Sequence, residues 1–137
     1  MGTHRQTIGR WGEDQAESYL VGQGYEILAR NVRTPYGEID LVARQAFAIE
    51  PGAAPPALAT VFVEVKTRTT TSYGLPEEAI NRRKQAHLLA SAQSYLQSHP
   101  ELEGDWRIDV IAVQRLRGCQ APSLHHFENA LSDMGNS

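Results

Sequence analysis

The sequence of 137 residues lacks several features that mark common classes of protein. It has 1 cysteine, which excludes a disulfide-linked scaffold and a zinc site built from cysteines. No apolar run approaches the ~20 residues that a membrane-spanning helix needs. The opening residues, MGTHRQTIGR, contain no apolar segment of the kind found in signal peptides. These absences favour a cytoplasmic protein that does not enter a membrane, and the length fits one domain.

Positive charge is also scarce, because 13 Lys and Arg face 16 Asp and Glu for a net charge of -3. Proteins that bind nucleic acid are usually basic, so this balance argues mildly against such a partner. The charge is uneven, however, and residues 61–90 carry five basic and three acidic side chains. A DNA substrate therefore stays compatible with the charge, with modest and salt-sensitive non-specific affinity.

Hydrophobic periodicity predicts two helices and four or five strands. The predicted helices cover about residues 6–21 and 76–98, and the predicted strands cover 25–32, 37–44, 60–67, 107–114 and 124–129. Pro76, followed by Glu77 and Glu78, suits the first turn of a helix. The Ala/Pro-rich stretch at 46–60 is predicted to be a loop or hairpin tip. The order α-β-β-β-α-β-(β) predicts one α/β domain over residues 1–137, with a core at about 6–115, a C-terminal segment at 116–137 and a mixed sheet flanked by helices.

Acidic residues interrupt two of the predicted strands. In GEIDLVA, alternation places Ile39 and Leu41 on one face and Asp40 on the other. In VFVEVKTR, Glu64 and Lys66 lie opposite the valines. If the strands form a hairpin, Asp40 lies near Glu64, with Lys66 beside both. A half-exposed sheet face would also explain this pattern.

Polar residues also fall among the apolar positions of both helices. On the second helix, Asn81, Lys84 and Gln85 share the sector of Leu88. Snorkelling of Lys84 explains part of this pattern, but buried polar groups need partners, and a carboxylate cluster on the sheet would supply them. Glu13 flanks the apolar stripe of the first helix.

Two close carboxylates repel each other, and a divalent cation removes that conflict. Oxygen ligands suit Mg²⁺ or Mn²⁺, and a bound metal can generate a nucleophile and neutralise phosphoryl charge. Lys66 would orient the water or stabilise developing charge. Asp40, Glu64 and Lys66 therefore form a plausible metal-dependent nuclease site, although Glu-x-Lys alone often occurs by chance.

The segments GRWGEDQAESYL, GYEILARNVRTPYGEIDLVA, VFVEVKTR, RRKQAHLLASAQSYL and RIDVIAV resemble the YraN-like family of bacterial proteins over about residues 8–115. That family resembles the restriction-endonuclease-like PD-(D/E)xK nucleases, including archaeal Holliday junction resolvases. The resemblance implies a three-layer restriction-endonuclease-like fold and Mg²⁺-dependent hydrolysis of DNA, including branched or structured DNA. It makes Asp40 and Glu64 the metal ligands and Lys66 the motif lysine, with Glu13 and Gln85 in support. Here Ile replaces the motif proline, and the insert at 46–60 is longer than the family's usual turn.

Several basic residues near these motifs in the sequence are candidate phosphate contacts: Arg30, Arg33, Arg68, Arg82, Arg83 and Lys84. A resolvase acting on two-fold symmetric junctions would be expected to form a homodimer. Nuclease folds can lose catalysis, so a non-catalytic module that binds nucleic acid or protein is the alternative function. An RNA substrate also stays open, because no feature identifies a reader of the 2′-hydroxyl.

Asp109 lies inside the apolar segment RIDVIAV and is predicted to be either a buried hydrogen-bonded acid or a residue at the rim of the site. His125 and His126 would face opposite sides of a strand, which argues against a shared metal.

Overall fold

The computed structural model describes residues 4–46, 58–68, 81–115 and 121–131. The elements are α1 (His4–Gly22), β1 (Glu26–Thr34), β2 (Gly37–Ala46), β3 (Leu58–Arg68), α2 (Arg82–Ser98), the 3-10 helix η2 (Pro100–Leu102), β4 (Asp105–Gln114) and β5 (Ser123–Phe127). This order confirms the predicted arrangement of helices and strands. Within the described residues, no helix has the length and apolar character to cross a membrane.

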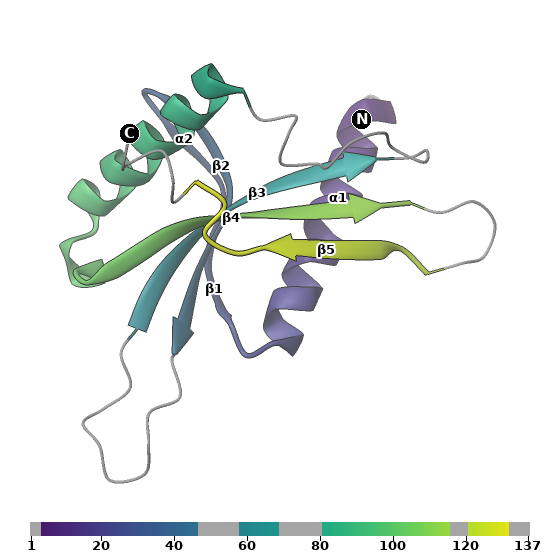
Figure 1. The fold of residues 1–137 in the computed structure, drawn as a ribbon, viewed down its shortest axis with the longest axis horizontal. Coiled ribbons are helices and arrows are strands. Elements are labelled where there is room, and N and C mark those ends of the chain that lie inside the picture. The colour runs from purple at the N-terminus through teal and green to yellow at the C-terminus, as the bar shows by residue number, and fades with distance from the viewer. Residues whose placement is uncertain (1–3, 47–57, 69–80, 116–120, 132–137) are drawn as a thin grey trace, which may run out of the picture.

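The five strands form one mixed sheet in the order β1-β2-β3-β4-β5 (Figure 1). β1, β2 and β3 pair antiparallel, β3 and β4 pair parallel, and β5 returns antiparallel to β4. A parallel pair needs a crossover connection, and α2 lies in the chain between β3 and β4.

The two helices pack with two separate apolar clusters of the sheet. Ala16 and Leu20 of α1 pack with Leu41, Val61 and Ile111. Leu88, Ala92 and Tyr95 of α2 pack in the other cluster, which includes Phe62 and Val110. Because neighbouring residues of β3, Val61 and Phe62, belong to different clusters, the helices cover opposite faces. Figure 1 shows α1 crossing behind β3, β4 and β5.

The hairpin arms of β2 and β3 extend into the stretch predicted to be a loop. Ala46 pairs with Leu58, Gln45 with Ala59 and Arg44 with Thr60. The prediction was therefore wrong at both ends of 46–60, because these flanking residues carry no proline and can continue the ladder. Residues 47–57, which contain the prolines, lie outside the described residues.

Helix α2 begins at Arg82, later than predicted. Asn81 has extended backbone angles, φ -76° and ψ 174°, and its side chain accepts a hydrogen bond from the Lys84 backbone N–H. Asn81 is therefore an exposed N-cap rather than a member of the helix's core-facing sector. The predicted start at Pro76 and its acidic first turn lie outside the described residues.

Helix α1 approaches the end of β3 closely at Gly12. A Cβ at this position would overlap the Thr67 side chain. Glycine therefore lets the helix backbone pack against the strand. The contact places the next residue, Glu13, near the end of β3 that carries the acidic and basic motif.

Candidate active site

The strands β2 and β3 separate where the predicted site begins. Their paired residues run as far as Leu41 and Val63. Beyond that pair, Asp40 Oδ2 accepts a hydrogen bond of 2.8 Å from the Val65 backbone N–H. The Asp40 carboxylate thus takes the role of a backbone carbonyl and is fixed at the fork between the strands.

Beyond the fork, the β1–β2 hairpin packs against α2. Thr34 Oγ1 donates to the buried Ser91 Oγ at 3.0 Å. Ile39 packs in the cluster of α2, whereas Leu41 packs in the cluster of α1. The prediction that Ile39 and Leu41 share a face was wrong, because strict alternation assumes a straight strand and β2 leaves the ladder between them.

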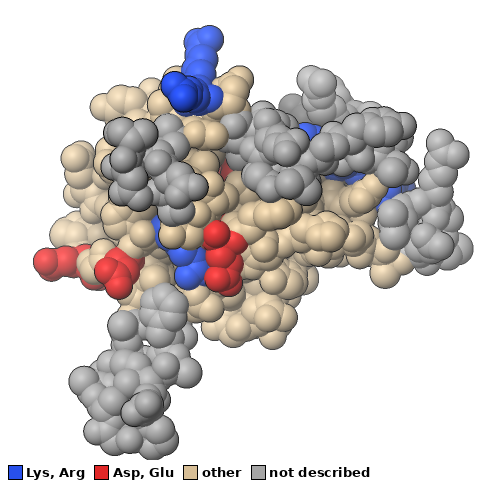
Figure 2. All heavy atoms as spheres, in the orientation of Figure 1, with Lys and Arg blue, Asp and Glu red and all other residues tan. Residues whose placement is uncertain are grey.

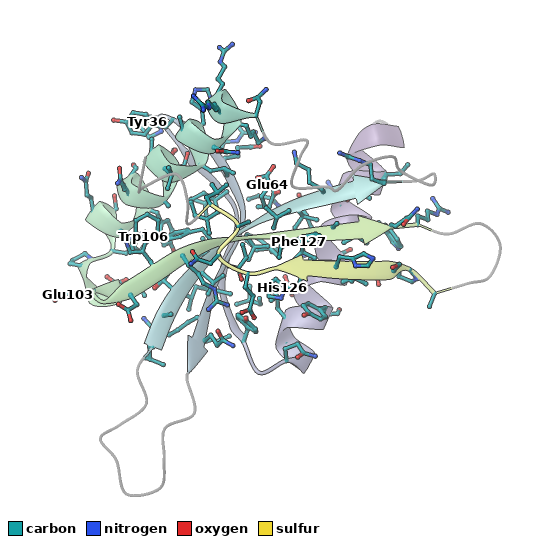
Figure 3. All side chains as sticks on the ribbon, viewed as in Figure 1. Tyr36, Glu64, Glu103, Trp106, His126 and Phe127 are labelled. Carbon is teal, nitrogen blue, oxygen red and sulfur yellow. The ribbon has the colours of Figure 1, made fainter. Side chains whose placement is uncertain are left out.

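Glu64 is the centre of the charged cluster. It is buried on β3, and its Oε1 lies 3.3 Å from Lys66 Nζ and 3.2 Å from Lys84 Nζ. Figure 3 shows the Glu64 side chain between β3, from which it comes, and α2. One lysine comes from the same strand and the other from the first turn of the helix. The structure thus brings Lys84 to the sheet carboxylate that was expected to partner the polar side of α2.

The carboxyl group of Asp40 has a strongly raised pKa. Burial raises the pKa of its carboxyl to about 7, and the nearby Glu64 carboxylate adds to the increase. The charge of Glu13 acts in the same direction, while the Val65 N–H and Lys84 oppose it. Without a further cation, Asp40 is thus only partly ionised at neutral pH, which is typical of a group whose surroundings are set for function.

Glu13 contributes from α1 to the edge of this cluster. Its Oε1 lies 3.4 Å from Arg30 of β1, and Arg30 also contacts Asp14 at 2.7 Å and Glu17 at 3.3 Å. Arg30 is therefore held by three carboxylates of α1. These ion pairs direct Arg30 towards α1, and its candidate role as a phosphate contact stays a prediction.

The other predicted residues lie on α2, at the end of β3 and on the β1–β2 hairpin. Gln85 is partly buried beside Lys84, and Arg82 is exposed at the start of α2. Figure 2 shows basic side chains projecting from the molecule in this region. Arg68 is partly buried at the end of β3 and donates to Thr67 O at 3.2 Å. Arg33, 87% exposed, contacts Glu38 at 3.1 Å on the β1–β2 hairpin.

The donor set fits Mg²⁺ better than the metals that need a complete protein cage. In the described part of the chain, no group of three or more His, Cys, Asp and Glu side chains is placed to hold a metal. Asp40 and Glu64 offer two carboxylates, and Mg²⁺ is commonly held by one or two carboxylates together with waters and substrate phosphates. Burial is the main cause of the raised pKa of Asp40, and the Glu64 charge that adds to it is the repulsion that a divalent cation relieves.

A second charged network lies on β4 and β5. Asp109, with no exposed surface, accepts hydrogen bonds from Arg107 at 2.9 and 3.2 Å and from the Asn129 backbone N–H at 2.8 Å. His126 Nε2 lies 2.7 Å from the same carboxylate, and its Nδ1 lies 3.1 Å from Tyr19 Oη. The structure thus settles Asp109 as the buried hydrogen-bonded acid of the two predicted alternatives.

This network is closed by partners on every side. Arg107 also donates to Tyr25 Oη at 2.8 Å, and Tyr19 packs edge-on against the His126 ring. Although burial opposes ionisation of Asp109, its hydrogen bonds to His126, Arg107 and Asn129 hold the pKa below the ordinary value. The spacing Arg-x-Asp within one strand is the sequence signal that could have indicated the Arg107 pair, since alternate residues share a face. We interpret this network as a structural one.

Comparison with known proteins identifies similar chains in bacteria. The family model described as "Uncharacterised protein family UPF0102" matches residues 12–113. A UPF0102 protein of Syntrophotalea carbinolica is 45% identical over 126 residues, 92% of each chain. Another from Dehalococcoides mccartyi is 38% identical over 133 residues, 97% of this chain and 99% of the relative. A third, from Alkaliphilus oremlandii, is 42% identical over 125 residues, 90% of this chain and 96% of the relative.

Proposed function

This chain belongs to the uncharacterised protein family UPF0102, and we propose that it is a cytoplasmic, metal-dependent endonuclease that hydrolyses phosphodiester bonds in DNA, including branched DNA. The observation that carries the proposal is the position of Asp40 at the fork between β2 and β3, where the Glu64 carboxylate is near enough to raise its pKa, with Lys66 3.3 Å from Glu64. The proposed partner is DNA, and the proposed cofactor is Mg²⁺ or Mn²⁺.

In this proposal Asp40 and Glu64 hold the metal ion. When bound, the ion supplies neutralisation of the phosphoryl oxygens and a more acidic water. Lys66 lies beside Glu64 and would orient the attacking water or stabilise the charge that develops on phosphorus. Glu13 supports the site through its negative charge, which reaches Asp40. Gln85, next to Lys84 on α2, has the proposed supporting role of a polar group.

A purely structural ion cluster would account less well for Asp40. Structural charges are normally paired well enough that ionisation is favoured, as at Asp109. The pKa of Asp40 moves the other way, because burial and the Glu64 charge outweigh its bond to Val65 N. A carboxyl group whose ionisation is disfavoured in this way is expected at a site where a bound ligand favours the ionised form.

The direct test is cleavage by the purified full-length chain. Linear, flapped and four-way DNA, with an RNA hairpin in parallel, would be incubated with Mg²⁺ or Mn²⁺ and analysed on denaturing gels. We expect metal-dependent cleavage of at least one DNA substrate, lost in Asp40→Ala and in Lys66→Ala. Glu38→Gln is the matched control, because it alters an exposed carboxylate two positions before Asp40 on the same strand.

If every DNA stays intact with both metals, the catalytic proposal fails. Retained DNA binding without metal binding would then support the alternative, a non-catalytic module on a nuclease-like fold. Cleavage that persists unchanged in Asp40→Ala would show that the reaction occurs elsewhere or comes from a contaminant.

A further inference from the structure

The proposed site holds one more cation than its motif requires. Lys66 Nζ and Lys84 Nζ both contact the same oxygen, Oε1 of Glu64, at 3.3 and 3.2 Å. Lys66 lies two residues from Glu64 on β3, whereas Lys84 reaches the carboxylate from α2. The pair between Lys84 and Glu64 therefore joins the helix to the sheet at the site itself.

A divalent cation on Asp40 and Glu64 would compete with these ammonium groups for Glu64. Like charges close together repel, so at least one lysine contact must weaken when metal binds. Lys84 is better placed to leave, because its side chain is 46% exposed and that of Lys66 is 19% exposed. Its departure would not disturb the helix start, since the Lys84 backbone N–H stays bonded to the Asn81 cap at 2.8 Å.

A displaced Lys84 would stay within side-chain reach of the site. The substrate phosphate is the anion that arrives there, and lysine is a flexible point charge suited to follow it. We propose that Lys84 is a transferable cation: it neutralises Glu64 in the metal-free protein and binds the substrate phosphate once metal occupies Asp40 and Glu64. This inference rests on the proposed function.

The proposal couples the binding of metal and DNA. Metal frees Lys84 for phosphate, and phosphate removes Lys84 from Glu64, so each ligand should raise the affinity for the other by the same factor. Lys84 thus acts against metal binding when DNA is absent and in favour of DNA binding when metal is present. A residue with only a structural role, or one that only attracts DNA, would not have both effects.

The first test is calorimetric titration of the full chain with Mn²⁺ alone. In Lys84→Gln the competitor for Glu64 is gone, so the Kd for Mn²⁺ should fall by about threefold or more relative to wild type. Arg10→Gln is the matched control, since it removes one positive charge from an exposed position on α1 that is not among the candidate phosphate contacts. It should change the Kd much less than Lys84→Gln. Circular dichroism would verify that both variants fold.

The second test measures affinity for a fluorescent DNA junction with and without Mn²⁺, in a Lys66→Ala background that prevents cleavage in the proposed mechanism. Mn²⁺ should increase DNA affinity in this background. The increase should be largely lost after Lys84→Gln is added and should persist after Arg10→Gln is added.

The outcomes separate this inference from the proposed function. If wild type binds Mn²⁺ and Lys84→Gln binds it equally or more weakly, the transferable-cation role is overturned while the metal site stands. The role is also overturned if Lys84→Gln keeps the full metal-dependent gain in DNA affinity. If neither wild type nor Lys84→Gln binds Mn²⁺, the proposed metal site fails, and this inference fails with it.

Discussion

Asp40 on β2 and Asp109 on β4 show how two aspartates of one sheet acquire opposite character. Asp109 is completely buried, yet its pKa lies below the ordinary value. Asp40 is partly buried, yet its pKa is raised to about 7. Burial opposes ionisation of both carboxyl groups, and the partners decide whether it is overcome: the hydrogen bonds of Asp109 outweigh burial, whereas at Asp40 the Glu64 charge adds to it. Asp109 faces Arg107 and His126, whereas Asp40 faces the Glu64 carboxylate.

The comparison indicates what each region contributes to the protein. The Asp109 network satisfies its charges internally, so it stabilises the fold and leaves nothing for a ligand to complete. The Asp40–Glu64 cluster leaves a conflict between carboxylates that an added cation would remove. Proteins commonly tolerate such tension at functional sites at the expense of stability.

The largest expected effect separates the two regions by activity. Asp40→Asn should lower the rate of metal-dependent DNA cleavage by about a thousandfold or more, because one of two proposed metal ligands loses its charge. Asp109→Asn, assayed at a temperature where it is folded, should keep the activity of wild type. Single-turnover cleavage assays would measure both rates. Equal losses of cleavage activity in Asp40→Asn and Asp109→Asn would contradict the functional difference between the two regions.

The free energy of unfolding should distinguish the two regions in the opposite way, because here the Asp109 network should matter more than Asp40. Asp109→Asn removes the charge partner of Arg107 and His126 inside the protein, so the free energy of unfolding should fall by about 3 kcal/mol or more. Urea denaturation followed by circular dichroism would measure this change. A loss below about 1 kcal/mol would show that the network contributes little to the fold.

Asp40→Asn should instead stabilise the metal-free protein near pH 8, by on the order of 2 kcal/mol. Because the pKa of Asp40 is raised in the folded state, wild-type stability from this group falls as pH rises from about 4 to about 7 and stays low above. The variant lacks this decline, so its advantage should grow over the same interval. Denaturation in a chelator across pH would measure it, and an advantage that does not change with pH would contradict the raised pKa.

For Asp109 the pH dependence has the opposite sign. Its lowered pKa contributes stability that is present above the ordinary value of an aspartate, about 4, and is lost as pH falls below it. The same denaturation series should therefore show the difference between wild type and Asp109→Asn shrinking in acid. A difference that grows in acid would rule out this explanation.

The smallest expected effect lies at the edge of the Asp109 network. Tyr25→Phe removes the hydroxyl that accepts from Arg107 at 2.8 Å, while Asp109 still holds the guanidinium. The free energy of unfolding should fall by about 1 kcal/mol. Urea denaturation at pH 7 would measure the change, and a loss as large as that of Asp109→Asn would mean that Tyr25 is central to the network.

Much of the geometry of the candidate site was predictable, because it follows from the two-residue repeat of strands and the 3.6-residue repeat of helices. Alternation along β3 places Glu64 and Lys66 on one face, and helical spacing directs Lys84 towards the sheet. The later start of α2 was missed because Pro76, followed by Glu77 and Glu78, also suits a first turn, whereas the capping bond of Asn81 decides the boundary.

Other features depend on contacts between distant segments and could not be read from one strand or helix. Ile39 changes face because the β1–β2 hairpin leaves the ladder and packs on α2. Arg30 meets the acids of α1 only when β1 lies beside that helix. The bond between Asp109 and His126 likewise requires β4 and β5 to pair in one register.

The central claim is that Asp40 and Glu64 form a metal site. Anomalous diffraction from crystals of the full chain soaked in Mn²⁺ tests this most directly. The account predicts an anomalous peak between the two carboxylates, with Lys84 moved away from Glu64 Oε1. A map without that peak, with Glu64 still paired to both Lys66 and Lys84 at saturating Mn²⁺, would contradict it.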